Sequence, residues 1–172
     1  MKRLGDWRLA AEDDFESKRA ARRPLLAFLL ATLAVGAAAS VFTEPSLAGW
    51  YQGVNKPAFA PPAWLLPPLW TGLYALMALA AWRVWKIAGL KSTAMALYSL
   101  QLAFTFVWTA LFFGPHRTAL ALSALVFLVV LGLATDIVFW RHDRLAGLLY
   151  LPCVAAVGFA AVLVRLFQAL NG

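Results

Sequence analysis

Charged residues are rare along most of the chain, and the intervals between them form five long apolar runs. The charge-free intervals cover residues 24–43, 57–82, 92–116, 118–135 and 145–164. A helix needs about 17–25 mostly apolar residues to cross the hydrocarbon core of a bilayer, and each interval supplies that length. Transmembrane β-strands are about half as long and alternate in polarity, which none of these runs does. The pattern therefore predicts an all-α membrane protein, a five-transmembrane-helix bundle with helices at about 24–43, 62–87, 92–114, 117–140 and 145–168.

The composition excludes a water-soluble globular protein. Of the 172 residues, 63% are hydrophobic and 13% are charged, whereas ordinary soluble domains have about 45–50% and about 25%. A soluble chain of this composition would expose large apolar patches, which soluble monomers rarely do. The first apolar run is also too long for a cleavable signal peptide, whose apolar region has about 7–15 residues. We expect one membrane domain, residues 24–172, preceded by a charged N-terminal tail, residues 1–23.

The net charge of +7 is distributed unevenly between the two ends of the predicted bundle. Twelve of the fifteen Lys and Arg residues fall in the tail, the second loop or the fourth loop, whereas Lys56, Arg117 and Arg165 fall on the other side. Positive residues stay on the cytoplasmic side when a membrane protein is inserted. We therefore predict a multi-pass topology with the N-terminus inside and the C-terminus outside. The expected partner is the lipid bilayer, and no nucleic acid is expected.

Residues 50–74 do not read as an ordinary spanning helix. Five of the nine prolines lie between positions 57 and 68. Proline removes a backbone donor and disfavours helix at the preceding residue, so we expect an ordered, mostly non-helical, Pro-rich loop over residues 44–61. The second helix should begin near Pro62–Trp64, with Pro67 and Pro68 distorting its early turns. Irregular backbone survives near lipid only when it is buried in protein or lines a cavity, so the loop should cover the mouth of the bundle.

Aromatic side chains share one face on each of two predicted helices. Trp70 and Tyr74 are one helical turn apart, and the third helix repeats the pattern at i, i+3, i+4, i+7 and i+11 with Gln101, Phe104, Thr105, Trp108 and Phe112. The amide of Gln101 and the indole N–H of Trp108 are costly to leave unpaired in hydrocarbon. That face should therefore look inward, toward other helices or a pocket. Interfacial belt residues or plain packing remain the alternative interpretation.

These residues carry a family resemblance. The first-loop motif comprises Trp50-Tyr51, Lys56-Pro57, Phe59, Pro61-Pro62, Trp64, Pro67, Trp70 and Tyr74. Further similarity lies in Gln101, Phe104, Trp108, Phe112-Phe113-Gly114, Ala146-Gly147 and Leu151-Pro152. Together they resemble the TspO/MBR family, the translocator proteins or peripheral-type benzodiazepine receptors, over roughly residues 25–171. We expect a bacterial member in a bacterial membrane.

The resemblance implies a five-helix bundle, often a homodimer, that binds porphyrins, sterols and benzodiazepine-site ligands in a pocket under the first loop. A flat, apolar macrocycle suits such a pocket because aromatic faces stack on it. The candidate ligand-binding residues are Tyr51, Pro57, Pro61, Trp64, Trp70, Tyr74, Gln101, Phe104, Thr105, Trp108, Ala156 and Ala160.

The chain departs from the family pattern at four positions. Thr105 stands where the family usually has Asn, and Val164 follows Leu163 where the family has a Leu-Asn pair. In the fifth helix, Pro152 is followed by Cys153 and then by Ala156, where the family usually has Tyr and Trp. We therefore expect a wider, more apolar pocket with altered ligand preference.

The leading functional hypothesis is a binding or translocator-type membrane protein for tetrapyrroles, such as porphyrin or heme, or similar hydrophobic ligands, acting in sensing, regulation or transport. The alternative is a membrane enzyme that promotes light-dependent porphyrin degradation, a role attributed to tryptophans on the second and fifth helices of some relatives. Trp70 matches the first tryptophan, but Ala156 replaces the second and disfavours this reading. No catalytic residue or cofactor is expected, and no metal site, because His116, His142 and Cys153 fall in separate places.

Overall fold

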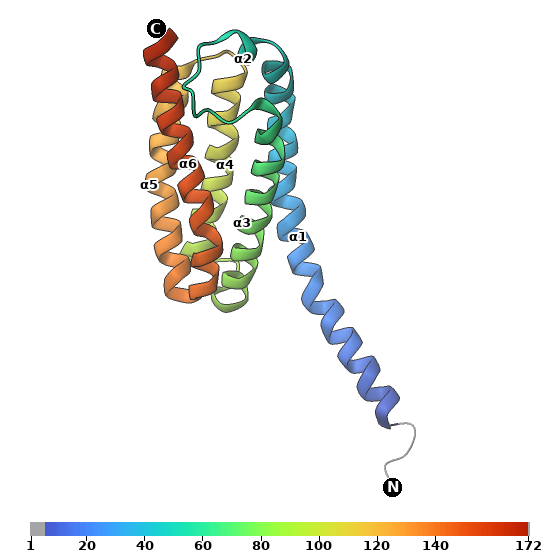
Figure 1. Ribbon diagram of the computed structural model, residues 1–172. Coiled ribbons are helices and arrows are strands. Elements are labelled where there is room, and N and C mark those ends of the chain that lie inside the picture. Colours follow the sequence, from blue (N-terminus) through green and yellow to red (C-terminus); the bar gives the residue numbers. More distant parts are fainter. Residues whose placement is uncertain (1–5, 172) are drawn as a thin grey trace.

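The fold consists of helices. The computed structural model describes residues 6–171, and their side chains from Arg23 onward. Its elements, in chain order, are α1 (Asp6–Ala48), α2 (Trp50–Gly53), the short 3-10 helix η1 (Ala63–Leu65), α3 (Leu66–Ala88), α4 (Thr93–Phe113), α5 (Thr118–His142) and α6 (Arg144–Asn171) (Figure 1). No strand occurs within this part of the chain. In the described residues, five segments are long and apolar enough to cross a membrane: Arg23–Ala48, Ala63–Ala88, Thr93–Phe113, Thr118–His142 and Arg144–Asn171. The predicted all-α, five-helix membrane class is confirmed.

The five long helices form a closed ring. Helix α1 packs on α3 and α4, α5 packs between α4 and α6, and α6 returns to α3. Helix α3 also touches α4 and α5 across the ring. In Figure 1 the N-terminal part of α1 continues as a straight helix beyond the bundle, at the end opposite the C-terminal end of α6. An odd number of spanning helices requires that the two ends of the chain lie on opposite sides.

The outside of the ring is apolar, as a lipid-facing surface must be. Leu30, Val130 and Val162 are 69%, 62% and 54% exposed, whereas the alanines at positions 78, 80 and 81 on α3 are completely buried. Small side chains let membrane helices approach closely, since lipid offers little hydrophobic drive for their association. The three small side chains therefore let α3 pack closely against its neighbours in the ring.

Polar contacts join the helices at the end of the bundle that lies opposite α2 (Figure 1). The guanidinium of Arg83 on α3 donates to the carboxylate of Asp143 between α5 and α6, at 2.7 Å. Asp143 also accepts from the backbone N–H of Leu145 at 2.9 Å and so caps α6. Partial burial opposes ionisation of Asp143, but these hydrogen bonds and the Arg83 charge outweigh it and lower the pKa of the carboxyl. Further into the membrane, the buried hydroxyls of Thr32 and Tyr98 hydrogen-bond and join α1 to α4.

The segment between the first two spanning helices is more helical than expected. Residues 44–48 complete α1 and residues 50–53 form α2, which leaves 54–62 without helix. Pro45 does not end α1, because the following Ser46 and Leu47 are buried and the carbonyl of Pro45 accepts from the Gly49 N–H at 3.1 Å. Packing therefore outweighs the local preference that proline imposes, as spanning helices often allow.

The prolines at the start of α3 do not distort it, contrary to expectation. Helix α3 begins at Leu66 after η1, so Pro67 and Pro68 fall in its first turn. The N–H groups of a first turn have no partner inside the helix, and proline therefore removes no hydrogen bond there. These two residues define where the helix begins and place Trp70 in its next turn.

Candidate functional site

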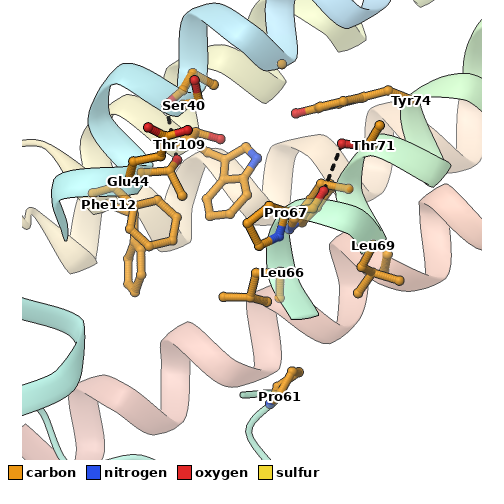
Figure 2. A pocket seen from close by; sticks show the side chains of 18 of the residues that line it. Ser40, Glu44, Pro61, Leu66, Pro67, Leu69, Thr71, Tyr74, Thr109 and Phe112 are labelled. Carbon is orange, nitrogen blue, oxygen red and sulfur yellow. Dashed lines mark hydrogen bonds between the residues drawn. The ribbon is translucent and has the colours of Figure 1, made fainter. Parts of the chain in front are cut away.

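An internal cavity lies between α1, α3, α4 and α6, next to residues 54–62. Its volume is about 370 Å³. Its aromatic lining consists of Tyr51, Trp70, Tyr74, Trp108, Phe112, Phe113, Phe159 and Phe167. Its polar lining consists of Ser40, Thr43, Glu44, Thr71 and Thr109. Figure 2 shows Ser40 and Glu44 with Thr109 and Phe112 on one side, and Pro67, Thr71 and Tyr74 of α3 on the other.

The central wall of the cavity is built from two indoles and a phenol. The ring centroid of Trp70 lies 5.7 Å from that of Trp108 on α4 and 6.1 Å from that of Tyr74 on the same helix. The Trp108 indole N–H is buried without a hydrogen-bond partner in the described part of the chain. Trp70 and Tyr74 reach the same cavity because they are one turn apart on α3. Together these rings form a broad, apolar surface suited to stacking on a flat ligand.

The segment beside the cavity is held by the side chain of Lys56. Its ammonium donates to the carbonyl of Tyr51, to that of Val54 at 3.2 Å and to that of Gln52 at 3.4 Å. It also lies 4.8 Å from the centroid of the Tyr51 ring, within cation–π range. The Lys56 side chain thus stabilises the turn that follows α2.

The same segment is fastened to the end of the chain. The backbone N–H of Asn55 donates to the side-chain oxygen of Asn171, and the Asn171 amide donates back to the Asn55 carbonyl, both at 2.9 Å. Beneath it, the Tyr51 ring lies 5.7 Å from that of Phe167 on α6, and burial raises the pKa of the Tyr51 phenol. The segment is therefore held by the hydrogen bonds of Lys56, by those of Asn171 on α6, and by the packing of Tyr51 on Phe167.

The twelve candidate residues lie in three different parts of the structure. Seven line the cavity: Tyr51, Pro61, Trp70, Tyr74, Trp108, Ala156 and Ala160. Pro57 and Trp64 line a second pocket, which shares Tyr51 and Pro61 with the first. The remaining three, Gln101, Phe104 and Thr105, line neither of these pockets.

Two of those three residues of α4, Gln101 and Phe104, contact α5. Phe104 packs on Phe127, with ring centroids 4.5 Å apart. Gln101 and Thr105 are buried, and the Thr105 hydroxyl donates to the Gln101 carbonyl at 2.8 Å. Gln101 lies against Gly132 of α5, whose lack of a side chain makes room for the amide. The inward face of α4 is thus divided between the cavity and a helix contact.

The α6 side of the cavity is apolar, and three of its side chains are small. Ala156, Ala160 and Val164 form it together with larger residues of the same helix. An indole at position 156 and an amide at position 164, which the family resemblance had suggested, are replaced by methyl and isopropyl groups. The cavity therefore has its tryptophans on α3 and α4 only.

Sequence reasoning missed the polar residues of α1. Glu44 marks the end of the first apolar run, and together with Ser40 it falls at i and i+4 on one helical face that lines the cavity. Thr109 was missed as well, four positions after Thr105 on α4. The signal in the sequence that could have identified Ser40 and Glu44 is their position directly before the proline-rich segment.

A closed ring of five spanning helices around an aromatic-walled cavity defines an integral, multi-pass membrane protein with an internal, mainly apolar cavity. The sequence pattern of the TspO/MBR family matches residues 28–167. The chain belongs to this family.

Curated relatives include bacterial and mammalian proteins. The chain is 37% identical to Protein CrtK of Rhodobacter capsulatus over 79% of its own length and 85% of that protein. It is 41% identical to the Tryptophan-rich sensory protein of Cereibacter sphaeroides, over 73% and 78% of the two chains. The human Translocator protein is 32% identical over 81% of this chain and 85% of its own.

Proposed function

We propose that this protein binds a hydrophobic ligand of the tetrapyrrole class, such as a porphyrin or heme, in the cavity beneath residues 54–62. The observation that carries the proposal is the wall formed by Trp70, Tyr74 and Trp108 around an apolar space of about 370 Å³. Binding pockets for small molecules have volumes of about 300–1,000 Å³ and are mainly apolar and aromatic with a few polar groups. This cavity has that size and that character.

The cavity also offers a large ligand a way to extend outward. Pro67 and Thr71 on α3 and Glu44 on α1 line it and are exposed. Because α1 and α3 pack side by side, these residues mark an opening between the two helices. A macrocycle could therefore place its centre against the indoles and its edge at this opening.

The role we propose for binding is sensing, regulation or transport rather than chemistry. Bacterial relatives carry the name tryptophan-rich sensory protein and mammalian relatives the name translocator protein. The α6 wall holds alanine at positions 156 and 160, so it offers no oxidisable side chain there. This favours binding over the porphyrin-degrading alternative.

We further propose that the N-terminus is cytoplasmic and that the cavity opens toward the other side. Arg83, Lys86, Lys91, Arg141 and Arg144 flank the ends of helices at the end of the bundle remote from α2. Cationic residues concentrate on the cytoplasmic side of membrane proteins. A ligand would then enter from the non-cytoplasmic half of the bilayer.

A titration tests the proposal. Protoporphyrin IX, heme and a benzodiazepine-site ligand are added in turn to the purified protein in detergent while tryptophan fluorescence is recorded. We expect saturable quenching by the tetrapyrroles, since two tryptophans line the cavity. A five-helix membrane protein of another family with as many tryptophans is the control. Linear, unsaturable quenching equal to that of the control would refute tetrapyrrole binding.

A further inference from the structure

One charged side chain lines the cavity, that of Glu44 on α1. Among the residues described with side chains, no Lys, Arg or His forms an ion pair with this carboxylate. Glu44 is exposed and stands four positions before the end of α1 at Ala48. The carboxylate therefore lies at the opening of the cavity, near the end of the spanning segment, while the indoles lie deeper.

The hydroxyl groups around Glu44 act as acceptors toward the cavity. Ser40 donates its hydrogen to the Ala37 carbonyl at 2.8 Å, and Thr43 donates to the Ala39 carbonyl at 3.1 Å. Thr109 donates in the same way to the Thr105 carbonyl at 2.8 Å. A hydroxyl has one hydrogen and two lone pairs, so each oxygen keeps only acceptor capacity for a ligand. The α1 side of the opening thus combines a negative charge with acceptors.

The lysine of the second pocket, which adjoins the cavity, already has hydrogen-bond partners. Lys56 lines the second pocket and not the cavity. Its ammonium has three hydrogens, and the structure gives it three backbone carbonyls as acceptors, those of Tyr51, Gln52 and Val54. A carboxylate on a ligand at the opening would therefore meet Glu44 and find no free counter-charge on the cavity wall.

We propose that Glu44 makes this cavity selective for ligands that carry a positive charge or N–H donors at the edge facing α1, and that it disfavours anionic edges. The inference rests on the proposed function, because it concerns the same cavity, and it specifies the charge of the preferred ligand. A positive group about 4 Å from a carboxylate is favoured about fivefold even at the dielectric constant of bulk water, and more strongly beside an apolar wall. Glu44 therefore discriminates between ligands of the same shape by charge.

Two porphyrins with one ring and opposite charge test this. The first is mesoporphyrin with its two propionates, and the second is the same ring with both propionates converted to aminoethyl amides. Each is titrated at neutral pH and low salt into the purified full-length protein in a neutral detergent, and binding is followed by the shift of the porphyrin absorbance. We expect the dication to bind about tenfold more tightly than the dianion, with a preference that weakens as salt is added.

Three variants assign the preference to Glu44. In Glu44→Gln the two affinities should become nearly equal, and in Glu44→Lys the order should reverse. Asp136→Asn is the matched control, since it also removes a carboxylate from a spanning helix but does not line the cavity. That variant should keep the wild-type ratio. Circular dichroism and gel filtration confirm that each variant is folded.

The outcomes separate this inference from the proposed function. If the wild type binds neither ring, tetrapyrrole binding is wrong and the charge selectivity is wrong with it. If it binds both rings with equal affinity, or prefers the dianion, the cavity binds tetrapyrroles but Glu44 does not select them. A preference for the dication that survives unchanged in Glu44→Gln also overturns the inference.

Discussion

The ring of Tyr74 on α3 lies directly against the backbone of Gly36 on α1. A Cβ atom at position 36 would come within 2.5 Å of Tyr74 Cε2 and 2.7 Å of Cδ2, distances that real Cβ atoms essentially never show. Figure 2 shows Tyr74 extending from α3 with its hydroxyl toward the α1 side. The missing side chain of Gly36 therefore sets both the approach of two helices and the position of one wall of the cavity.

Gly36→Ala should disturb the cavity and the fold together. The added methyl must displace the Tyr74 ring, and overpacking of this kind costs about 1–3 kcal/mol. We expect a lower midpoint of thermal unfolding in detergent and weaker porphyrin binding. Gly72→Ala is the control, because a Cβ there would meet nothing within 4 Å, and it should leave both quantities unchanged. Combining Gly36→Ala with Tyr74→Ala should recover part of the thermal midpoint; no recovery would mean that the two residues are not coupled.

Trp70→Ala should weaken binding of a macrocycle without unfolding the protein. Trp70 packs on Trp108 and Tyr74 at the centre of the wall, and loss of a buried aromatic contact is worth roughly 1–3 kcal/mol. This corresponds to about a five- to hundredfold loss of affinity, measured by titration. Trp82→Ala is the control, since Trp82 lies near the other end of α3 under the ammonium of Lys86, 3.7 Å from its ring centroid. Equal losses in the two variants would indicate a general destabilisation.

Illuminated porphyrin should not be consumed faster with this protein than with an unrelated membrane protein that has as many tryptophans. The reason is that Ala156 and Ala160 occupy the α6 wall, so a porphyrin there meets methyl groups rather than an indole. The porphyrin absorbance under constant light, in the presence of oxygen, gives the measurement. Rapid, stoichiometric conversion to a new absorbing species would contradict the expectation and revive the enzyme hypothesis.

Asp143→Ala should lower the thermal stability at neutral pH by removing the cap of α6 and the partner of Arg83. Loss of such a cap costs about 0.5–2 kcal/mol, and the partly exposed ion pair adds little. The pKa of Asp143 is lowered in the folded protein, so its contribution is present above the unfolded pKa of about 3.9 and disappears as the pH falls through the folded value. The difference between wild type and variant should therefore shrink at a pH below about 4.

Arg83→Gln distinguishes the two contributions of Asp143. It removes the ion pair at 2.7 Å but leaves the hydrogen bond from the Leu145 N–H. We expect a smaller loss of thermal stability than in Asp143→Ala. A loss as large as in Asp143→Ala would show that the ion pair, rather than the cap, holds this end of the bundle.

The topology can be read with fusion reporters. Twelve of the fifteen basic residues belong to the tail and to the second and fourth loops, and we therefore expect the C-terminus on the non-cytoplasmic side. A reporter that is active only in the cytoplasm should be silent when fused to the C-terminus and active when fused to the N-terminus. The reverse pattern would place the cavity opening on the cytoplasmic side.

Much of the fold followed from the spacing of charges, but the contents of the cavity followed only in part. Trp70 and Tyr74 could be placed together because one turn of helix separates them, whatever their neighbours are. On α4 the same periodicity grouped Thr105 with Trp108, yet only Trp108 reaches the cavity. Periodicity defines an inward face, and it does not say which of two neighbouring helices a residue on that face will meet.

Other features depend on contacts between distant segments and leave no local pattern. Nothing around Gly36 signals that the ring of residue 74 will rest on it. Residues 44–48 show the opposite case, since we expected a mostly non-helical loop from residue 44, whereas Ser46 and Leu47 are buried and the helix continues to Ala48. In both cases the deciding energy comes from packing between helices that a single run of sequence does not contain.

The reciprocal pair of hydrogen bonds between Asn55 and Asn171 closes a loop of chain across a sequence separation of 116 residues. It ties the last turn of α6 to the segment that lies beside the cavity. We expect an affinity tag attached behind Asn171 to disturb these two hydrogen bonds and so to change the rate of ligand exchange. Ligand exchange in this protein is therefore to be measured on chains whose C-terminus is left native and whose tag is placed at the other end.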